Sequence, residues 1–505
     1  MELFLVLLLL AGFTYILVRN SAKGLTTTPV WLLWLVIMIP AITWSVWFLV
    51  MGEDEPPPPL LLIIPFIVSP LLYFWLIQKG RKDQGGEATN SNSSPQATAS
   101  NQNLQATLLE QQQQQQKKPP KLLSKNEEEQ LKSCFSWEFY YLQNLDYGGQ
   151  AVLCRGKLRT APDKAYYKIK KNIQEKFGDR FLVIFQESFQ GKEPFFALVP
   201  NPRTKEKEET RNNDELNKPV LALSLAVITL FTTTVVGATL AGVSQEEAQS
   251  DPNLLLEGLP YALSLMWILG CHEFSHYFTA IYYNIRATLP YFIPFPFFLG
   301  TLGAFIQMKS PIPHRKALFD VGIAGPIGGF VMTVPLLLWG LSLSEIVSLT
   351  DESGLLVVES LDPRSSLLMT VLCKLALGED FVQGTAIALH PIAIAGYIGV
   401  IVTALNLMPV GQLDGGHIVH AMYGQRTAVI IGQISRFLML ILAIIEPSFL
   451  IWAILLFFMP IFDEPALNDV SELDQVRDLL GFLSLVLLVS ILLPLPATFT
   501  EFLNV

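Results

Sequence analysis

The chain has 505 residues, of which 51% are hydrophobic and only 15% are charged, and its mean hydropathy is +0.41. This composition excludes an ordinary soluble enzyme and indicates a membrane protein with many spans. The net charge of −10 says little about partners, but no basic patch with interleaved aromatic residues supports a nucleic-acid partner, and the four cysteines show no CxxC spacing.

Three hydrophobic runs open the chain, at about Leu3–Val18, Val30–Val50 and Leu60–Ile77. The first resembles a secretory signal in its apolar character, but it lacks a basic start and carries Glu2, so we expect a retained transmembrane helix. Basic residues follow the third run, which places its end on the cytoplasmic side by the positive-inside rule. Residues 1–78 are therefore expected to form a membrane region with three spans.

A low-complexity linker, residues 79–133, comes next and contains a run of six glutamines. Its composition cannot bury enough apolar surface to fold. Residues 134–202 are expected to form a small α+β soluble domain. Its predicted elements are a helix over Ala161–Phe177 and strands over Phe181–Gln186 and Phe195–Val199. The sequence leaves its role open between regulation, substrate presentation and plain structure.

A charged linker, residues 203–219, leads to a second set of hydrophobic runs. The expected spans are Val220–Ala241, Leu259–Ile285, Val321–Leu343, Pro391–Met408, Val429–Ile445, Phe449–Phe462 and Leu480–Pro494. One connection, Asp463–Asp478, is strongly acidic although this topology makes it cytoplasmic. The predicted fold is thus an all-α polytopic membrane protein of about ten transmembrane helices with a small α+β soluble domain.

The segment His272-Glu273-Phe274-Ser275-His276 lies inside the second of these spans. Histidines at i and i+4 share one helix face and can bind one zinc ion, with the glutamate between them placed as general base. Ionisable residues at membrane depth indicate a functional site. The alternative is a pair of histidines packed in a core. Cys271 is expected to pack against a helix, because adjacent helical positions point about 100° apart.

A catalytic zinc takes three protein ligands and keeps one position open for water. A later apolar run, Asn406–His417, is broken by Pro409 and three glycines and carries a carboxylate, Asp414. Broken backbone at membrane depth is tolerated only where it is buried in protein or lines a wet cavity. Asp414 is therefore the predicted third ligand. His417 is the competing ligand, and helix capping is the alternative role for Asp414.

These paired motifs resemble the site-2 protease family of intramembrane zinc metalloproteases. The resemblance covers about residues 220–424. The matching segments are His272-Glu273-x-x-His276, Asn406-x-x-Pro409-x-x-x-x-Asp414-Gly415, Gly300-Thr-Leu-Gly303-Ala304, Phe319-Asp320 and Ala324-Gly325-Pro326. Residues 134–202 are similar to the domain that precedes the core in the cyanobacterial and plastid branch, the ethylene-dependent gravitropism-deficient and yellow-green type.

The resemblance implies that zinc is bound by His272, His276 and Asp414, that Glu273 activates a water molecule, and that Asn406 positions the substrate or stabilises the oxyanion. Residues 220–463 would then form the metalloprotease core, followed by a C-terminal loop and final span, residues 464–505. The implied reaction is hydrolysis of peptide bonds in or near the transmembrane segments of membrane proteins, with membrane lipid around the enzyme. The oligomeric state is not indicated.

Three other functions are compatible with parts of this pattern. A metal or proton transporter places histidine and aspartate in spans but does not need Glu273. A scaffold without zinc chemistry would work through its soluble domain, and a hydrolase of the prenyl-protein protease kind would cut outside a transmembrane substrate. The apolar start, poor in serine and arginine, favours a bacterial (cyanobacterial) origin and a plasma or thylakoid membrane, with the site toward the cytoplasm.

Overall fold

The structure is a computed structural model that describes residues 14–15, 28–51, 65, 68–69, 72–73, 76, 122–148, 151–187, 193–201, 218–297, 299–348, 360–361, 366–378, 381, 385–445 and 449–494. The glutamine-rich part of the predicted linker, most of the first and third predicted spans and most of the charged linker lie outside the described residues. The chain divides into two compact units, Met1–Gln114 and Gln115–Val505.

The first unit contains helices α2 (Val30–Ile37) and α3 (Ile39–Met51), which cover the second predicted span. Together the two helices are long and apolar enough to form one membrane span, but they are bent by 56° relative to each other. Pro40 lies at this bend, and a proline lacks the N–H that would continue the helical hydrogen bonds.

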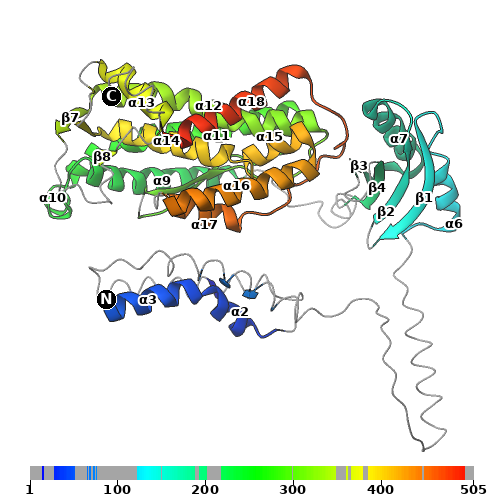
Figure 1. Cartoon of the computed structure of the whole chain (residues 1–505), viewed down its shortest axis with the longest axis horizontal. Coiled ribbons are helices and arrows are strands. Elements are labelled where there is room, and N and C mark those ends of the chain that lie inside the picture. Colours follow the sequence, from blue (N-terminus) through cyan, green and yellow to red (C-terminus); the bar gives the residue numbers. More distant parts are fainter. Residues whose placement is uncertain are drawn as a thin grey trace, which may run out of the picture. The chain divides into compact units, whose positions relative to one another are not determined.

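The second unit begins with an α+β domain in which helices pack against a four-stranded antiparallel sheet (Figure 1). Its elements are α6 (Lys125–Lys132), β1 (Tyr140–Gly148), β2 (Ala151–Leu158), α7 (Pro162–Phe177), η1 (Gly178–Arg180), β3 (Phe181–Glu187) and β4 (Pro194–Pro200). The sheet order is β1-β2-β4-β3. The predicted helix and both predicted strands are present as α7, β3 and β4, whereas α6, β1 and β2 were not predicted from the sequence.

Helix α6 lies within the stretch predicted to be linker, so the linker prediction is wrong for its last residues. A capping box fixes the start of α6, because Ser124 accepts from the backbone N–H of Glu127 while the Glu127 carboxylate accepts from that of Ser124. Leu131 of α6 is fully buried in the domain core. Two cysteines of this core, Cys134 and Cys154, are free thiols, and burial raises the pKa of both.

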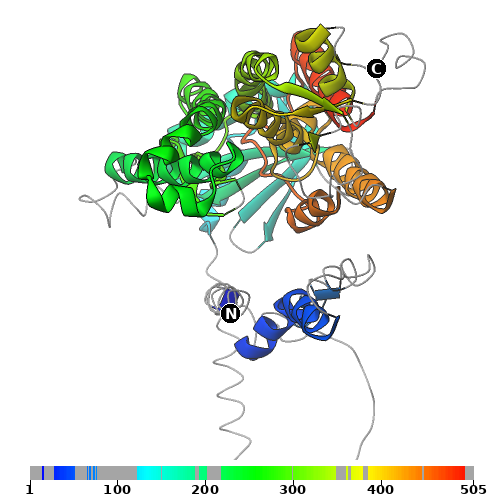
Figure 2. The ribbon, with the colours of Figure 1, turned by 90° about the vertical axis from the view of Figure 1, so that its left-hand side faces the viewer.

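The remaining elements of the second unit form a bundle in which helices run side by side, as Figure 1 shows from the side and Figure 2 along the helix axes. They are α9 (Pro219–Leu240), α10 (Gln245–Ser250), η2 (Pro252–Gly258), α11 (Leu259–Tyr282), β5 (Tyr291–Pro294), β6 (Thr301–Phe305), α12 (Arg315–Ser342), β7 (Glu345–Ser348), β8 (Ser360–Leu361), α13 (Leu367–Leu377), β9 (Thr385–Ala388), α14 (Pro391–Leu407), α15 (Asp414–Tyr423), α16 (Gln425–Ile445), α17 (Leu450–Phe458) and α18 (Gln475–Leu492).

Five helices in the described part of the chain are long and apolar enough to cross a membrane, or six when the bent pair α2–α3 is taken as one span. The five segments are Pro219–Leu240, Pro252–Tyr282, Arg315–Ser342, Gln425–Ile444 and Gln475–Leu492. Two predicted spans are shorter: α14 has 17 residues and α17 has 9. About 20 residues are needed to cross a bilayer, so the ten-span arrangement stays a prediction.

The centre of the bundle is formed by α11, α12 and α14, which carry most of the segments singled out in the sequence. Gly396 and Gly399 of α14 lie directly against Leu337 and Thr333 of α12, so that a Cβ at either glycine would fall within 3 Å of that neighbour. Small residues permit such close approach between membrane helices. This contact holds α14 against α12. It therefore also fixes the position of the chain break that follows α14.

Candidate metal centre

Helix α11 places three of the predicted site residues on one buried segment. His272, Glu273 and His276 are only 5%, 8% and 7% exposed. The helix is uninterrupted over its 24 residues, so the i, i+4 spacing puts both imidazoles on one face. Their ring centroids are 4.9 Å apart.

The break predicted around Pro409 brings a carboxylate to this face. Helix α14 ends at Leu407, and Gly411 adopts a left-handed conformation with φ of 54° before α15 begins at Asp414. Asp414 is the first residue of α15, where the helix dipole favours a negative charge. The alternative role of Asp414, helix capping, also places it at the start of a helix. In the structure, however, its side chain makes no capping hydrogen bond and lies close to both histidines.

The three candidate ligand atoms form a nearly equilateral triangle. His272 Nε2 lies 3.2 Å from His276 Nε2, and Asp414 Oδ2 lies 3.4 Å from the former and 3.3 Å from the latter. A tetrahedral zinc site with bonds of about 2.0–2.1 Å has edges of about 3.3–3.4 Å. The donors therefore fit three corners of a zinc tetrahedron. Among the described residues, this is the one group of three or more His, Cys, Asp or Glu side chains with this capacity.

The surroundings of His276 fix its orientation and tautomer. Its Nδ1 lies 2.8 Å from the backbone oxygen of Val321 in α12, so Nδ1–H donates and Nε2 keeps its lone pair for a metal. Gly325, one turn later in α12, makes room for the imidazole, since a Cβ there would lie 2.0 Å from Nε2.

Asn406 also reaches the site from the last turn of α14. Its Nδ2 lies 3.4 Å from His272 Nε2, at one side of the ligand triangle. The structure thus brings together all five residues predicted from the sequence, which are His272, Glu273, His276, Asn406 and Asp414.

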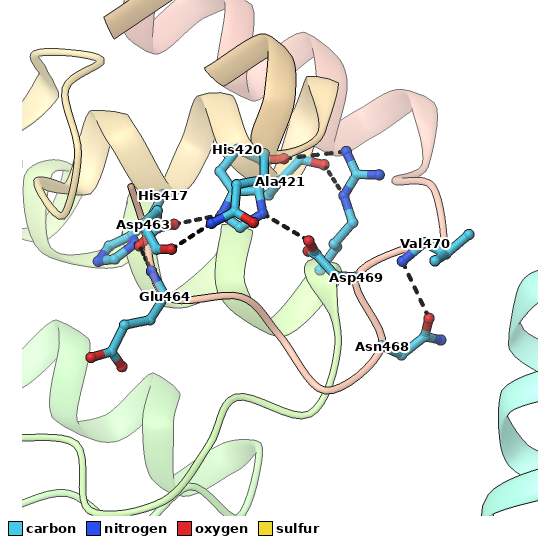
Figure 3. Close-up of polar contacts among 10 residues, drawn as sticks. His417, His420, Ala421, Asp463, Glu464, Asn468, Asp469 and Val470 are labelled. Atoms are coloured by element: carbon cyan, nitrogen blue, oxygen red, sulfur yellow. Dashed lines mark hydrogen bonds and ion pairs between the residues drawn. The ribbon is translucent and has the colours of Figure 1, made fainter. Parts of the chain in front are cut away.

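His417, the competing third ligand, faces away from the triangle. Its Nδ1 lies 2.8 Å from Asp463 Oδ1, in the connection between α17 and α18 (Figure 3). His417 is thus paired with a carboxylate of another segment and is not one of the three side chains of the ligand triangle.

The chain between α11 and α12 forms a two-stranded hairpin of β5 and β6. Strand β5 pairs antiparallel with β6, and in the described part of the chain the second edge of β6 has no strand partner. The hairpin lies beside the site, because β6 contacts α11, the helix that carries Glu273.

An ion pair lies next to the residue that orients His276. Arg477 of α18 donates from Nε and Nη2 to the two oxygens of Asp320, at 2.8 and 2.6 Å, and the Tyr283 hydroxyl donates to the same carboxylate. Asp320 immediately precedes Val321, whose carbonyl orients His276. Asp320 was visible in a motif, but nothing in the sequence near Arg477 marks it as the partner.

Replacing Arg477 with lysine is expected to lower the free energy of unfolding by about 1–3 kcal/mol, because an ammonium cannot donate to both carboxylate oxygens in this geometry. The midpoint of heat denaturation in detergent should fall accordingly. Arg426→Lys, at an exposed arginine of α16, is the matched control. Equal midpoints for the two variants would show that the ion pair contributes nothing.

Comparison with known proteins gives a family match over the site. Residues 260–445 match peptidase family M50, and residues 129–207 match the EGY3 middle domain. "Probable zinc metalloprotease EGY2, chloroplastic" of Arabidopsis thaliana is 30% identical over 369 residues, covering 72% of this chain and 64% of that protein. No solved structure matches the chain.

Two further relatives carry similar names. "Probable zinc metalloprotease EGY1, chloroplastic" of Arabidopsis thaliana is 29% identical over 378 residues, which cover 68% of this chain and 66% of that protein. "Probable zinc metalloprotease EGY3, chloroplastic" of Oryza sativa subsp. japonica is 26% identical over 383 residues, which cover 72% of this chain and 64% of that protein. The matched region thus spans just under two thirds of the length of each relative.

Proposed function

We propose that the protein, whose residues 260–445 match peptidase family M50, is an intramembrane zinc metalloprotease of the site-2 protease family. One observation supports the proposal most strongly. The triangle of His272, His276 and Asp414 has the size of a zinc site, and Glu273 adjoins it on the same helix.

The residues divide the proposed reaction between them. Bound zinc would polarise the scissile carbonyl and lower the pKa of a water molecule from about 15.7 towards about 7. The Glu273 carboxylate is placed to accept a proton from an attacking water molecule and to return it to the leaving amine. Asn406, at the side of the triangle, is placed to donate from its amide to the carbonyl oxygen of the substrate.

The proposed substrates are membrane proteins cut in or near a transmembrane segment. A carbonyl within an α-helix is occupied by its own hydrogen bond, so the substrate must unwind locally before attack. Strand β6 offers an edge without a strand partner among the described residues, and an extended segment can add to such an edge through backbone hydrogen bonds. The hairpin beside Glu273 would thereby hold the unwound substrate at the site.

A protease explains Glu273 better than either non-proteolytic function does. A transporter or a scaffold has no requirement for a carboxylate between two metal-binding histidines, and the relatives are named as metalloproteases. We propose a plasma or thylakoid membrane, with the site toward the cytoplasmic side or its plastid equivalent. The relatives are named chloroplastic, and none of them supports the bacterial source expected from the sequence.

Reconstitution into liposomes with a single-span substrate protein tests the proposal. We expect cleavage in or next to the substrate's transmembrane segment, mapped by mass spectrometry of the products, with loss of cleavage on chelation and recovery on adding zinc. Zinc-independent cleavage, or movement of zinc or protons across the liposome without cleavage, would contradict it.

A further inference from the structure

The connection between α17 and α18 holds the strongest cluster of buried charge outside the metal centre. Asp463 and Asp469 are 6% and 5% exposed, and His420 of α15 is fully buried between them. His420 Nδ1 lies 2.7 Å from Asp463 Oδ2, and Nε2 lies 3.0 Å from Asp469 Oδ2 (Figure 3). Ionised carboxylates only accept hydrogen bonds, so a doubly protonated imidazole satisfies both.

This cluster holds one face of α15, the helix that begins with Asp414. His417, one turn before His420, faces the second oxygen of Asp463. The C-terminal end of α15 is held as well, because the buried guanidinium of Arg315 donates to the carbonyls of His420 and Ala421, at 3.2 and 2.9 Å. Helix α15 is about 15 Å long and moves as a rigid unit. Contacts at its C-terminal end and on the face with His417 and His420 therefore determine where Asp414 lies.

The same connection binds the soluble domain. Residues 467–469 pair with β3 through an isolated parallel β-bridge between Phe185 and Asn468: Phe185 N–H donates to the Leu467 carbonyl at 2.7 Å, and Asp469 N–H donates to the Phe185 carbonyl at 2.8 Å. Asn468 and Ser471 both donate to the carboxylate of Asp163, in the first turn of α7. Val470 is buried in the core of that domain.

The other side of residues 467–469 faces the start of α12, where Asn468 forms a second isolated bridge, with His314. Leu467 and Asn468 donate their backbone N–H groups to the carbonyls of Ile312 and Pro313, at 2.8 and 3.1 Å. Residues 467–469 therefore lie between the soluble domain and the start of α12, with hydrogen bonds to both. Asp469 bonds to β3 through its backbone and to His420 through its side chain.

We propose that Asp463 and Asp469 are positioning residues for the third metal ligand, and that their connection links docking of the soluble domain to metal binding. When β3 and α7 hold residues 467–471, the two carboxylates hold His420, and α15 presents Asp414 to His272 and His276. The linkage is reciprocal, so a bound metal also stabilises the docked domain. This inference rests on the proposed zinc site and adds a role for the domain, which the sequence left open.

Zinc affinity of the full chain in detergent, measured by competition with a chromophoric chelator, tests the linkage without using proteolysis. Asp163→Ala removes the acceptor for Asn468 and Ser471 on α7, in the soluble domain. We expect it to weaken zinc binding about tenfold, and Asp469→Asn to weaken it at least as much. Glu472→Gln, at an exposed carboxylate of the same connection, is the matched control and should bind zinc as the wild type does.

Hydrogen exchange at the amides of residues 467–469 supplies the reciprocal measurement. Adding zinc to the wild type should slow this exchange, and the slowing should be lost in Asp469→Asn. Asn468→Ala, which removes one donor to Asp163, serves if Asp163→Ala does not fold. Faster exchange in these variants with zinc affinity within twofold of wild type would overturn the linkage. A wild type that binds no zinc would instead overturn the proposed function.

Discussion

Glu273→Gln is expected to abolish peptide hydrolysis while leaving zinc bound. Glutamine has nearly the same size as glutamate but cannot take a proton from water or return it to the leaving amine. Loss of general acid–base catalysis lowers rates by about 10²–10⁴-fold. Because Glu273 is not part of the ligand triangle, the zinc content per monomer should equal that of the wild type.

Cleavage of a liposome-bound substrate and elemental analysis of the same preparation measure both parts of this prediction. Glu257→Gln, at an exposed carboxylate just before α11, is the matched control and should cleave at the wild-type rate. Wild-type cleavage by Glu273→Gln would remove Glu273 from the mechanism. Loss of zinc in this variant would make Glu273 part of the metal site and favour a metal-transport function.

Gly325→Ala is expected to abolish metal binding although it adds one methyl group. The new Cβ would lie 2.0 Å from Nε2 of His276 and 2.5 Å from Cδ2 and Cε1. The imidazole would have to leave its position, which breaks the hydrogen bond to Val321 and separates Nε2 from Asp414. We expect zinc affinity to fall by more than about 100-fold, since a ligand and its orienting partner are lost together.

Gly270→Ala is the matched control for this substitution, because Gly270 lies on α11 in the metal-site region and a Cβ there would meet Phe292 at 3.7 Å, an ordinary contact. Both variants are compared with the wild type by chelator competition and by thermal denaturation. Normal zinc binding by Gly325→Ala would show that the His276 imidazole does not occupy the position described here.

The sequence was sufficient to identify the candidate residues of the metal centre. It was not sufficient to exclude His417 as the third ligand in place of Asp414. Helical periodicity alone puts His272 and His276 on one face, and membrane depth makes them a functional site. The choice between Asp414 and His417 depends on how the chain turns between α14 and α15, which no local pattern specifies. The structure directs Asp414 to the histidines and His417 to Asp463.

The acidic connection shows most clearly what local patterns miss. In the sequence, the strongly acidic character of Asp463–Asp478 was notable only because the predicted topology places this segment on the cytoplasmic side. In the structure Asp463 and Asp469 are paired with buried histidines, and Asp474 caps α18. Each histidine partner lies more than 40 positions away along the chain, so periodicity and capping rules cannot identify the pair.

The soluble domain was predicted in part for a similar reason. The amphipathic pattern of α7 and the apolar runs of β3 and β4 are local, and these elements were found. Strands β1 and β2 carry polar and charged residues on their exposed face, which weakens their hydrophobic signal in the sequence. They pair with each other in the register Tyr141↔Lys157. Such pairing becomes visible only when the chain is folded.

Zinc per monomer in four freshly purified proteins tests the central claim most directly: wild type, His272→Ala, Asp414→Ala and Glu273→Gln. The account predicts about one zinc ion in the wild type and in Glu273→Gln, and little or none in the other two. Full zinc retention by Asp414→Ala would contradict the ligand triangle. A wild type that binds no zinc, even when zinc is supplied, would contradict the metalloprotease itself.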